Sequence, residues 1–179
     1  MLRPPESFET ARLTARPLTV ADAPDVFAAY ANDPEVTRYL AWKAYADVAP
    51  LAEFLKMCEE TWRTGQGHHT WLLSLRANQE VAGSIGLSVD RHQVVFGYVL
   101  GKKHWGQGLM AEPLRWLVDW SLAQPGIYRA WAFCDTENAS SARVMEKAGM
   151  QREGILRRWH VCPTIGPEPR DCISCSRVR

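Results

Sequence analysis

Three β-strand candidates follow one another so closely between residues 69 and 101 that they restrict the fold more than any other feature. The segments "HTWLLSLR", "EVAGSIGLSV" and "QVVFGYVLG" are rich in β-branched and aromatic residues, as strands are. Only short turns such as "ANQE" and "DRH" separate them. A parallel connection needs about a dozen or more residues, so the three segments must form an antiparallel meander.

Helical and strand patterns flank this meander on both sides. Thr19 and Asp22 have the spacing of an acidic variant of the capping box, which predicts a helix beginning at Thr19. Apolar residues recur at helical spacing between residues 51 and 62 and predict a second helix, which ends at the glycines of 65–67. The other elements that we expect are strands at 11–18, 128–134, 151–161 and 170–179, a turn with a short helix at 33–42, and helices at 109–123 and 138–149.

The order of these elements predicts a single α/β domain over residues 1–179. Its sheet should be mixed, mostly antiparallel and twisted, with about seven strands and with helices on both faces. A chain of 179 residues with 46% hydrophobic and 23% charged residues is large enough to bury such a core.

Composition also bounds the location and the partners. A net charge of +1 creates no field that would attract nucleic acid or an anionic membrane, so neither is an expected partner. No apolar run approaches the roughly 18 residues that span a bilayer, and "MLRPPESFETARL" lacks an apolar signal region, which predicts a cytoplasmic protein. Five scattered cysteines fit reduced thiols, and Cys172 and Cys175 fit ordinary thiols on a terminal strand better than a metal site.

The segment that follows the meander joins a strand to a helix through glycines. A helix N-terminus has about four backbone N–H groups without internal partners and carries partial positive charge. In "GKKHWGQGLMAE", Gly106 and Gly108 would let a phosphate approach these groups, and Lys102, Lys103 and His104 could add charge-assisted hydrogen bonds. The segment therefore predicts a phosphate-binding loop.

Two nucleotide motifs match this loop only in part. Gly101 and Gly106 have the spacing of a Walker A loop, but Gln107 and Gly108 stand where its lysine and hydroxyl residue belong. "GQGLMA" matches the dinucleotide fingerprint, yet it lies past the middle of the chain and no carboxylate follows near residues 127–129. The dinucleotide motif stays a minor alternative.

A third kind of loop agrees better, because other motifs accompany it. "GYVL" at 97–100, "WGQG" at 105–108, Glu112 and "NASSARVMEKAGM" at 138–150 resemble the GNAT superfamily of N-acetyltransferases, in particular its RimJ/RimL-type branch. The order of elements agrees over nearly the whole chain. The resemblance implies a GNAT fold and acetyl-coenzyme A as co-substrate, without a metal.

The resemblance also implies roles for individual residues. The strand before the loop should carry a bulge and splay from its neighbour, which opens a cleft for the pantetheine arm of the coenzyme. Ser141 would lie near the thioester sulfur and Asn138 would hydrogen-bond the arm. The remaining expected coenzyme contacts are Val99 and Leu100 along the arm, Lys103, His104, Trp105, Gly106, Gln107, Gly108 and Leu109 around the pyrophosphate, and Arg143 and Lys147 at phosphates.

Several of these residues have a plainer interpretation. Asn138 is a good helix N-cap, and Arg143 and Lys147 could form a solvated stripe on the helix. Glu112 is either a base or a structural charge in the first helical turn. Pro113 replaces the alanine that is usual in the family, which predicts strain or a kink just after the loop.

The chemistry of acyl transfer restricts which class of amine can accept the acetyl group. Strand 94–100 has no carboxylate, and Met145 stands where many superfamily members have a general-acid tyrosine, so Ser141 is the expected proton donor and the base is a water chain or a distant carboxylate. A weakly equipped base favours an α-amine, with a pKa of about 8, over a lysine, with a pKa of about 10.4.

We therefore expect a protein or peptide N-terminus as the acceptor, read by the early helices, strand 69–76 and loop 162–170. A small-molecule amine, a coenzyme A-binding protein without efficient catalysis, and a homodimer are left open.

Overall fold

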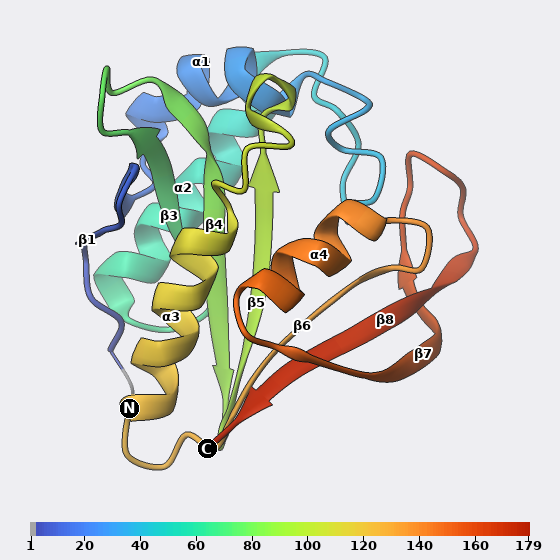
Figure 1. The fold of residues 1–179 in the computed structure, drawn as a ribbon. Helices are drawn as coiled ribbons and strands as arrows, with labels where there is room; N and C mark the ends of the chain where they lie inside the picture. Colours follow the sequence, from blue (N-terminus) through green and yellow to red (C-terminus); the bar gives the residue numbers. More distant parts are fainter. Residues whose placement is uncertain (1–2) are drawn as a thin grey trace.

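The computed structural model describes residues 3–179 and contains one mixed sheet with helices on both faces (Figure 1). The strands are β1 (Phe8–Glu9), β2 (Leu13–Pro17), β3 (His69–Leu75), β4 (Val81–Asp90), β5 (Gln93–Leu100), β6 (Arg129–Asp135), β7 (Gln151–Val161) and β8 (Pro169–Val178). The helical segments are η1 (Val20–Asp22), α1 (Ala23–Val26), η2 (Phe27–Ala31), α2 (Val48–Thr64), η3 (Lys102–His104), α3 (Ala111–Ala123) and α4 (Ala139–Lys147).

The strand order in the sheet is β1-β2-β3-β4-β5-β6-β8-β7. The meander β3–β4–β5 is antiparallel throughout, as the short turns predict. The sheet has eight strands instead of about seven, because two residues of the N-terminal segment pair with β2 as β1. The prediction of a short helix at 33–42 is wrong, because this segment is a series of turns. At its start, the Asp33 carboxylate accepts a hydrogen bond from the Glu35 N–H.

The two early helical regions begin and end where the capping residues predict. Asp22 accepts a hydrogen bond from the Thr19 N–H at 2.8 Å, and the chain then continues as η1, α1 and a π-helical turn, η2. Asp47 caps α2 by accepting from the Ala49 N–H. Gly65 ends α2 with a φ of 72°, a left-handed conformation that suits glycine.

The helices form two layers, one on each face of the sheet (Figure 1). On one face, side chains of the sheet such as Ile85 and Phe96 pack against α3 and α4 through Leu117 and Met145. On the other face, α1, η2 and α2 form a second core, in which Leu55 is fully buried. The prediction of helices on both faces is therefore confirmed.

Strands β5 and β6 separate soon after they meet. They are parallel and pair only from Gln93 to Val95 with Arg129 to Trp131. Beyond this point β5 continues alongside β4 and β6 alongside β8, so the two strands diverge. The splay that the resemblance implies is confirmed, but the bulge is wrong, because the β4–β5 register is unbroken from Gly83–Leu100 to Asp90–Gln93.

Two further findings concern membranes and metals. Within residues 3–179, no helix combines the length and the apolar character needed to cross a bilayer. The same residues include no group of three or more side chains suited to hold a metal ion. All five cysteines are buried free thiols.

Candidate active site

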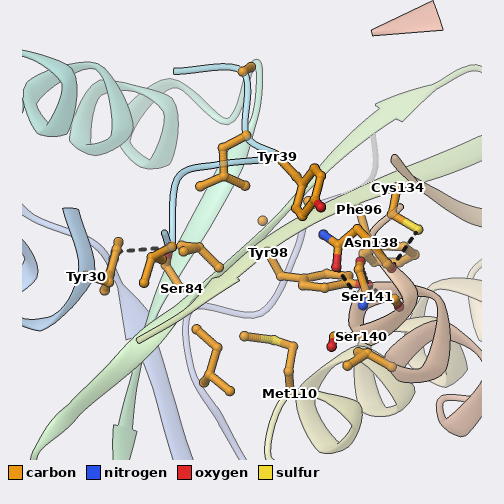
Figure 2. Close-up of a pocket in the computed structure, with 18 of the residues that line it drawn as sticks. Tyr30, Tyr39, Ser84, Phe96, Tyr98, Met110, Cys134, Asn138, Ser140 and Ser141 are labelled. Atoms are coloured by element: carbon orange, nitrogen blue, oxygen red, sulfur yellow. Dashed lines mark hydrogen bonds between the residues drawn. The ribbon is translucent and has the colours of Figure 1, made fainter. Parts of the chain in front are cut away.

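A cavity of about 800 Å³ lies at the opening between β5 and β6. Residues from both layers line it: Leu55 of α2 and Thr70 of β3 from one face, and Ser141 of α4 from the other. The two faces of the sheet therefore communicate through the gap that the diverging strands leave. Figure 2 shows Tyr39 and Ser84 around the same space as Tyr98, Asn138 and Ser141.

Most of the predicted site residues line this cavity, and four do not. The predicted residues in its wall are Val99, Leu100, Trp105, Gly106, Gly108, Leu109, Asn138, Ser141, Arg143 and Lys147. Lys103, His104, Gln107 and Glu112 are absent from the wall. The expected acceptor loop at 162–170 does not contribute to it either, whereas the turns at 35–42 do.

Ser141 is paired with a tyrosine of the sheet. Its Oγ lies 2.8 Å from the Tyr98 hydroxyl, which also donates to the Ser141 carbonyl at 3.1 Å (Figure 2). Burial raises the pKa of Tyr98, so its phenol stays protonated. Met145, by contrast, is fully buried in the core. The position on the helix thus offers no phenol, but β5 supplies one.

Tyr98 was missed by the sequence reasoning, although the signal was present. Residues two apart in a strand share a face. Val94, Phe96 and Tyr98 therefore point together, and the first two are core residues packed under α3 and α4. The alternation alone predicts that the Tyr98 side chain points toward the helix that carries Ser141.

Asn138 caps α4, as its plainer interpretation predicts, and it also borders the cavity. Its Oδ1 caps α4 by accepting from the Ser141 N–H at 3.1 Å. Its amide nitrogen finds no acceptor among residues 3–179, and the side chain borders the cavity. Beside it, the Cys134 thiol donates to the Asn138 carbonyl at 3.7 Å, and burial raises the pKa of Cys134 to about 11. This cysteine is therefore a protonated thiol at neutral pH.

The glycine loop presents a row of free backbone donors. Gly106 and Gly108 have φ values of 75° and 70°, which only glycine adopts without strain. Within the described chain, the N–H groups of residues 106–110 have no hydrogen-bond acceptor. They lie just before α3, so the helix dipole adds positive potential to these donors. The loop has the properties of an anion site.

The cations of this loop are engaged elsewhere. Lys102 forms an ion pair with Glu35, and Lys103 with Glu80 at 2.6 Å. His104 is buried, and its Nε2 lies 3.6 Å from the Glu80 carboxylate. The Gln107 amide turns back to the Lys103 carbonyl at 3.2 Å. These side chains stabilise the loop. The Gln107 N–H stays free for an anion, whereas the His104 N–H already donates to the Gly101 carbonyl at 2.9 Å.

Arg143 and Lys147 remain the free cations of the cavity wall. Both lie on the exposed face of α4, and neither forms a salt bridge with any described residue. Arg143 makes only a long hydrogen bond of 3.4 Å to the Ser140 hydroxyl. An anion in the loop could therefore draw on them without breaking an existing pair.

Glu112 lies outside the cavity and forms an ion pair with Arg12, the residue that immediately precedes β2. Its carboxylate accepts from Arg12 Nε at 2.5 Å and from the Arg12 backbone N–H at 3.1 Å, while Arg12 Nη1 donates to the Gln107 carbonyl. Burial would raise the pKa of Glu112, but hydrogen bonds from Thr10 and Arg12 outweigh it and lower the pKa. The Glu112 carboxylate is therefore engaged by Arg12 and does not face the cavity.

Pro113 causes no break in the helix. It is the third residue of α3, where a backbone N–H would lack an intrahelical acceptor in any case. The Glu112 N–H already uses the Leu109 carbonyl at 3.1 Å, and α3 runs on without interruption to Ala123. Pro113 is thus compatible with an unbroken α3.

Each carboxylate in the cavity wall is paired. Glu35 binds Lys102, and Arg170 bridges Asp135 and Glu137. Burial would raise the pKa of Asp135, but the Arg170 guanidinium outweighs it and keeps the pKa low. Among residues 3–179, the cavity thus offers no unpaired carboxylate to act as a base.

Comparison with known proteins agrees with this geometry. Residues 12–151 match the family described as "Acetyltransferase (GNAT) domain". An uncharacterized N-acetyltransferase p20 of Bacillus licheniformis is 30% identical over 157 residues, which cover 86% of this chain and 87% of that protein.

Solved structures agree in fold. The microcin C7 self-immunity acetyltransferase MccE, in complex with acetyl-coenzyme A and AMP, has a TM-score of 0.85 at 16% identity and covers 98% of each chain. RimL, a ribosomal L7/L12 α-N-protein acetyltransferase in complex with coenzyme A, has a TM-score of 0.83 at 17% identity and covers 97% of this chain and 98% of its own. The chain belongs to the GNAT family of acetyltransferases, enzymes that transfer an acetyl group from acetyl-coenzyme A.

Proposed function

We propose that this enzyme acetylates the α-amine at the N-terminus of a protein or peptide, by direct attack on acetyl-coenzyme A in a ternary complex. The observation that carries the proposal is the Ser141–Tyr98 hydroxyl pair in a cavity open to both faces of the sheet. Donor and acceptor can enter from opposite faces and meet beside that pair. A cytoplasmic setting, supported by five free thiols, belongs to the proposal, while a homodimer stays untested.

The donor would occupy the side of α3 and α4. The free N–H groups of 106–110 would bind the pyrophosphate, with Arg143 and Lys147 at its rim. The pantetheine arm would follow Val99, because the Leu100 carbonyl already accepts from the Trp105 indole at 2.7 Å. The Asn138 amide nitrogen would donate to a carbonyl of the arm. Holding both reactants in this way can supply about 7–11 kcal/mol.

The two hydroxyls would serve the leaving group. As the C–S bond breaks, Ser141 Oγ donates a proton to the thiolate, and Tyr98 hydrogen-bonds the serine oxygen while it does so. Because the pKa of Tyr98 is raised, the phenol remains a donor throughout this step.

The acceptor side favours an amine with a single positive charge. The carboxylates of the cavity wall are all paired, so a second ammonium group would find no free counterion. An α-amine also loses its proton at least about 250-fold more readily than a lysine, because their pKa values differ by about 2.4 units or more. RimL, named for α-N-protein acetylation, supports the same class.

A small aromatic amine is the second candidate. Tyr39, Trp42 and Tyr45 line the acceptor side, and Trp42 and Tyr45 are in contact with ring centroids 5.4 Å apart. Such rings bind flat apolar groups. MccE, solved with AMP, is a relative in fold whose complex contains an aromatic ligand.

An acetylation screen with free-thiol detection tests the proposal. Peptides with a free α-amine are compared with the same peptides blocked at the N-terminus but carrying a lysine, and with small aromatic amines. We expect transfer to the free α-amine. Transfer to the lysine alone would contradict the proposed acceptor.

The variant Ser141→Ala separates an enzyme from a coenzyme-binding protein. Loss of the proton donor should lower kcat by about 100-fold. The coenzyme A dissociation constant should change little, because Ser141 lies on α4 and the donors of the glycine loop are unchanged. Coenzyme A binding by the wild type without transfer to any amine would instead identify a binding protein.

A further inference from the structure

His68 lies on the acceptor side of the cavity in a position that only a glycine beneath it permits. It immediately precedes β3 and contributes to the cavity wall. A Cβ at Gly86 would lie 2.2 Å from His68 Nε2, which is far inside van der Waals contact. The absence of that Cβ lets the imidazole lie directly over the backbone of β4.

A second glycine extends this bare surface to the gap in the sheet. Gly97 is the partner of Gly86 in the β4–β5 register, so both positions face the same side. A Cβ at Gly97 would meet nothing within 4 Å, and Gly97 lines the cavity. It lies two residues beyond Val95, where pairing with β6 ends. An acceptor amine can thus lie on this floor between the His68 ring and the opening toward Ser141.

The orientation of the ring suits proton transfer. His68 Nδ1 lies 2.9 Å from the Ser88 hydroxyl, and Ser88 is two residues from Gly86 on the same face of β4. When Nδ1–H donates to Ser88, Nε2 keeps its lone pair on the side of the glycine floor. Partial desolvation, with a smaller contribution from His69, lowers the pKa of His68, so the neutral ring predominates at pH 7.

The other groups of the cavity are less suited to this task. Its carboxylates are paired with Lys102 and Arg170. His160 is the other imidazole in the wall; it packs edge-on against Phe133 on the far side of the gap. Burial lowers the pKa of His160, and Asp135 opposes this shift.

We propose that His68 is the general base of this acetyltransferase, a role that rests on the proposed function and adds the missing base to it. An ammonium acceptor gives one proton to His68 Nε2, and the neutral amine attacks the thioester carbon. The C–N bond forms, the C–S bond breaks, and the nitrogen loses a second proton. The coenzyme A thiolate takes a proton from the Ser141 hydroxyl, and the second proton from the nitrogen restores that hydroxyl. His68 releases the proton that it took from the ammonium to solvent. One proton is therefore released per amide formed.

A pair of amines of similar size tests this role. Benzylamine is an ammonium ion at pH 7, whereas 4-methylaniline is neutral and needs no proton removed before attack. His68→Gln should lower kcat/KM for benzylamine by about 100-fold at pH 7, and for 4-methylaniline by much less. Raising the pH should restore activity of the variant toward benzylamine, while coenzyme A affinity stays within about twofold of the wild type.

Two further variants make the result specific. Ser88→Ala removes the partner of Nδ1 and should reproduce part of the His68→Gln defect, again only for the ammonium acceptor. His160→Gln should not change the difference between the two amines. An equal loss for both amines in His68→Gln, or an amine-selective loss in His160→Gln alone, overturns the assignment.

The experiment also separates this inference from the proposed function. If the wild type transfers acetyl to neither amine nor to any peptide of the screen, both are overturned. If the wild type is active and His68→Gln is equally active on benzylamine, the role of His68 alone is overturned.

Discussion

Single residues decide what the cavity can do, and two of them act by lacking a side chain. Gly86 makes room for the His68 ring, and Gly97 leaves open floor beside it. In the proposed mechanism, Tyr98 and Ser141 lie at the opposite end of the path, where a proton would be donated instead of accepted. The distance between these two functions is set by the β4–β5 register, which pairs Gly86 with Gly97 one strand position before Tyr98.

Gly97→Ala tests whether the acceptor lies on this floor. The new methyl group meets no atom within 4 Å in the protein, and no unusual φ is needed, so stability should be unchanged or slightly higher. It occupies space that the acceptor needs, so the KM of the acceptor should rise about tenfold while coenzyme A affinity stays the same. Steady-state kinetics and calorimetric titration measure the two quantities.

Gly154→Ala is the matched control. Gly154 also has open space at its Cβ position, but it lies on the exposed edge strand β7, outside the cavity. It should change neither constant. An unchanged acceptor KM in Gly97→Ala would place the acceptor elsewhere.

Whole elements hold the anion loop in shape. Arg12 connects the start of β2 to the Gln107 carbonyl and to Glu112 in the first turn of α3. Lys103 and His104 fix the other end of the loop to Glu80, in the turn between β3 and β4. The free N–H groups are thus presented by a loop that is anchored on both sides.

Glu112→Gln distinguishes an anchor from a base. The Arg12 pair is partly exposed, so its loss should cost only about 1 kcal/mol of unfolding free energy. Coenzyme A affinity should fall a few-fold, because the loop loses one anchor, and kcat should stay within about threefold of the wild type. Denaturant unfolding and steady-state kinetics provide the measurements. A fall in kcat of about 100-fold or more would return Glu112 to the role of base.

The elements also show how far sequence reasoning extends. Turn length alone determines the antiparallel meander, and local capping residues determine the ends of α2 and α4. The strand β1 could not be predicted, because two residues carry no pattern and gain their structure by pairing with β2. The glycines predict the anion loop from the sequence, but the partner of Lys103 is a glutamate 23 residues away, which only the folded register brings near. The contact of the His68 ring with Gly86 likewise depends on long-range strand pairing.

At the scale of the molecule, three histidines make stability sensitive to mild acid. Burial lowers the pKa of His68, His69 and His160 from the usual 6.5. In the unfolded chain these groups take up protons near pH 6.5, whereas in the folded protein they do so only at lower pH. The unfolded state therefore binds more protons in this window, and acid favours it.

The unfolding free energy should consequently fall as the pH decreases from about 7 to 5. The paired carboxylates add their own losses only below this range, since the pKa of Glu153 is about 2 and that of Asp135 is lowered as well. Urea unfolding at pH 7.5 and pH 5.5 measures the difference, and substitution of His69 by Gln should reduce it. A stability that is constant or rising toward pH 5.5 would contradict the lowered pKa values of these rings.

The short pairing between β5 and β6 divides the sheet into two parts that few backbone hydrogen bonds join. Three residue pairs join a plate of five strands to a plate of three, and the cavity lies where the plates part. A coenzyme bound in that gap would contact both plates and stabilise their relative position. Saturating coenzyme A at 100 times its dissociation constant should raise the unfolding free energy by about 2.7 kcal/mol. Amide exchange should slow most in Phe96–Leu100 and in β6, and uniform slowing across the sheet would show that the plates already move as one.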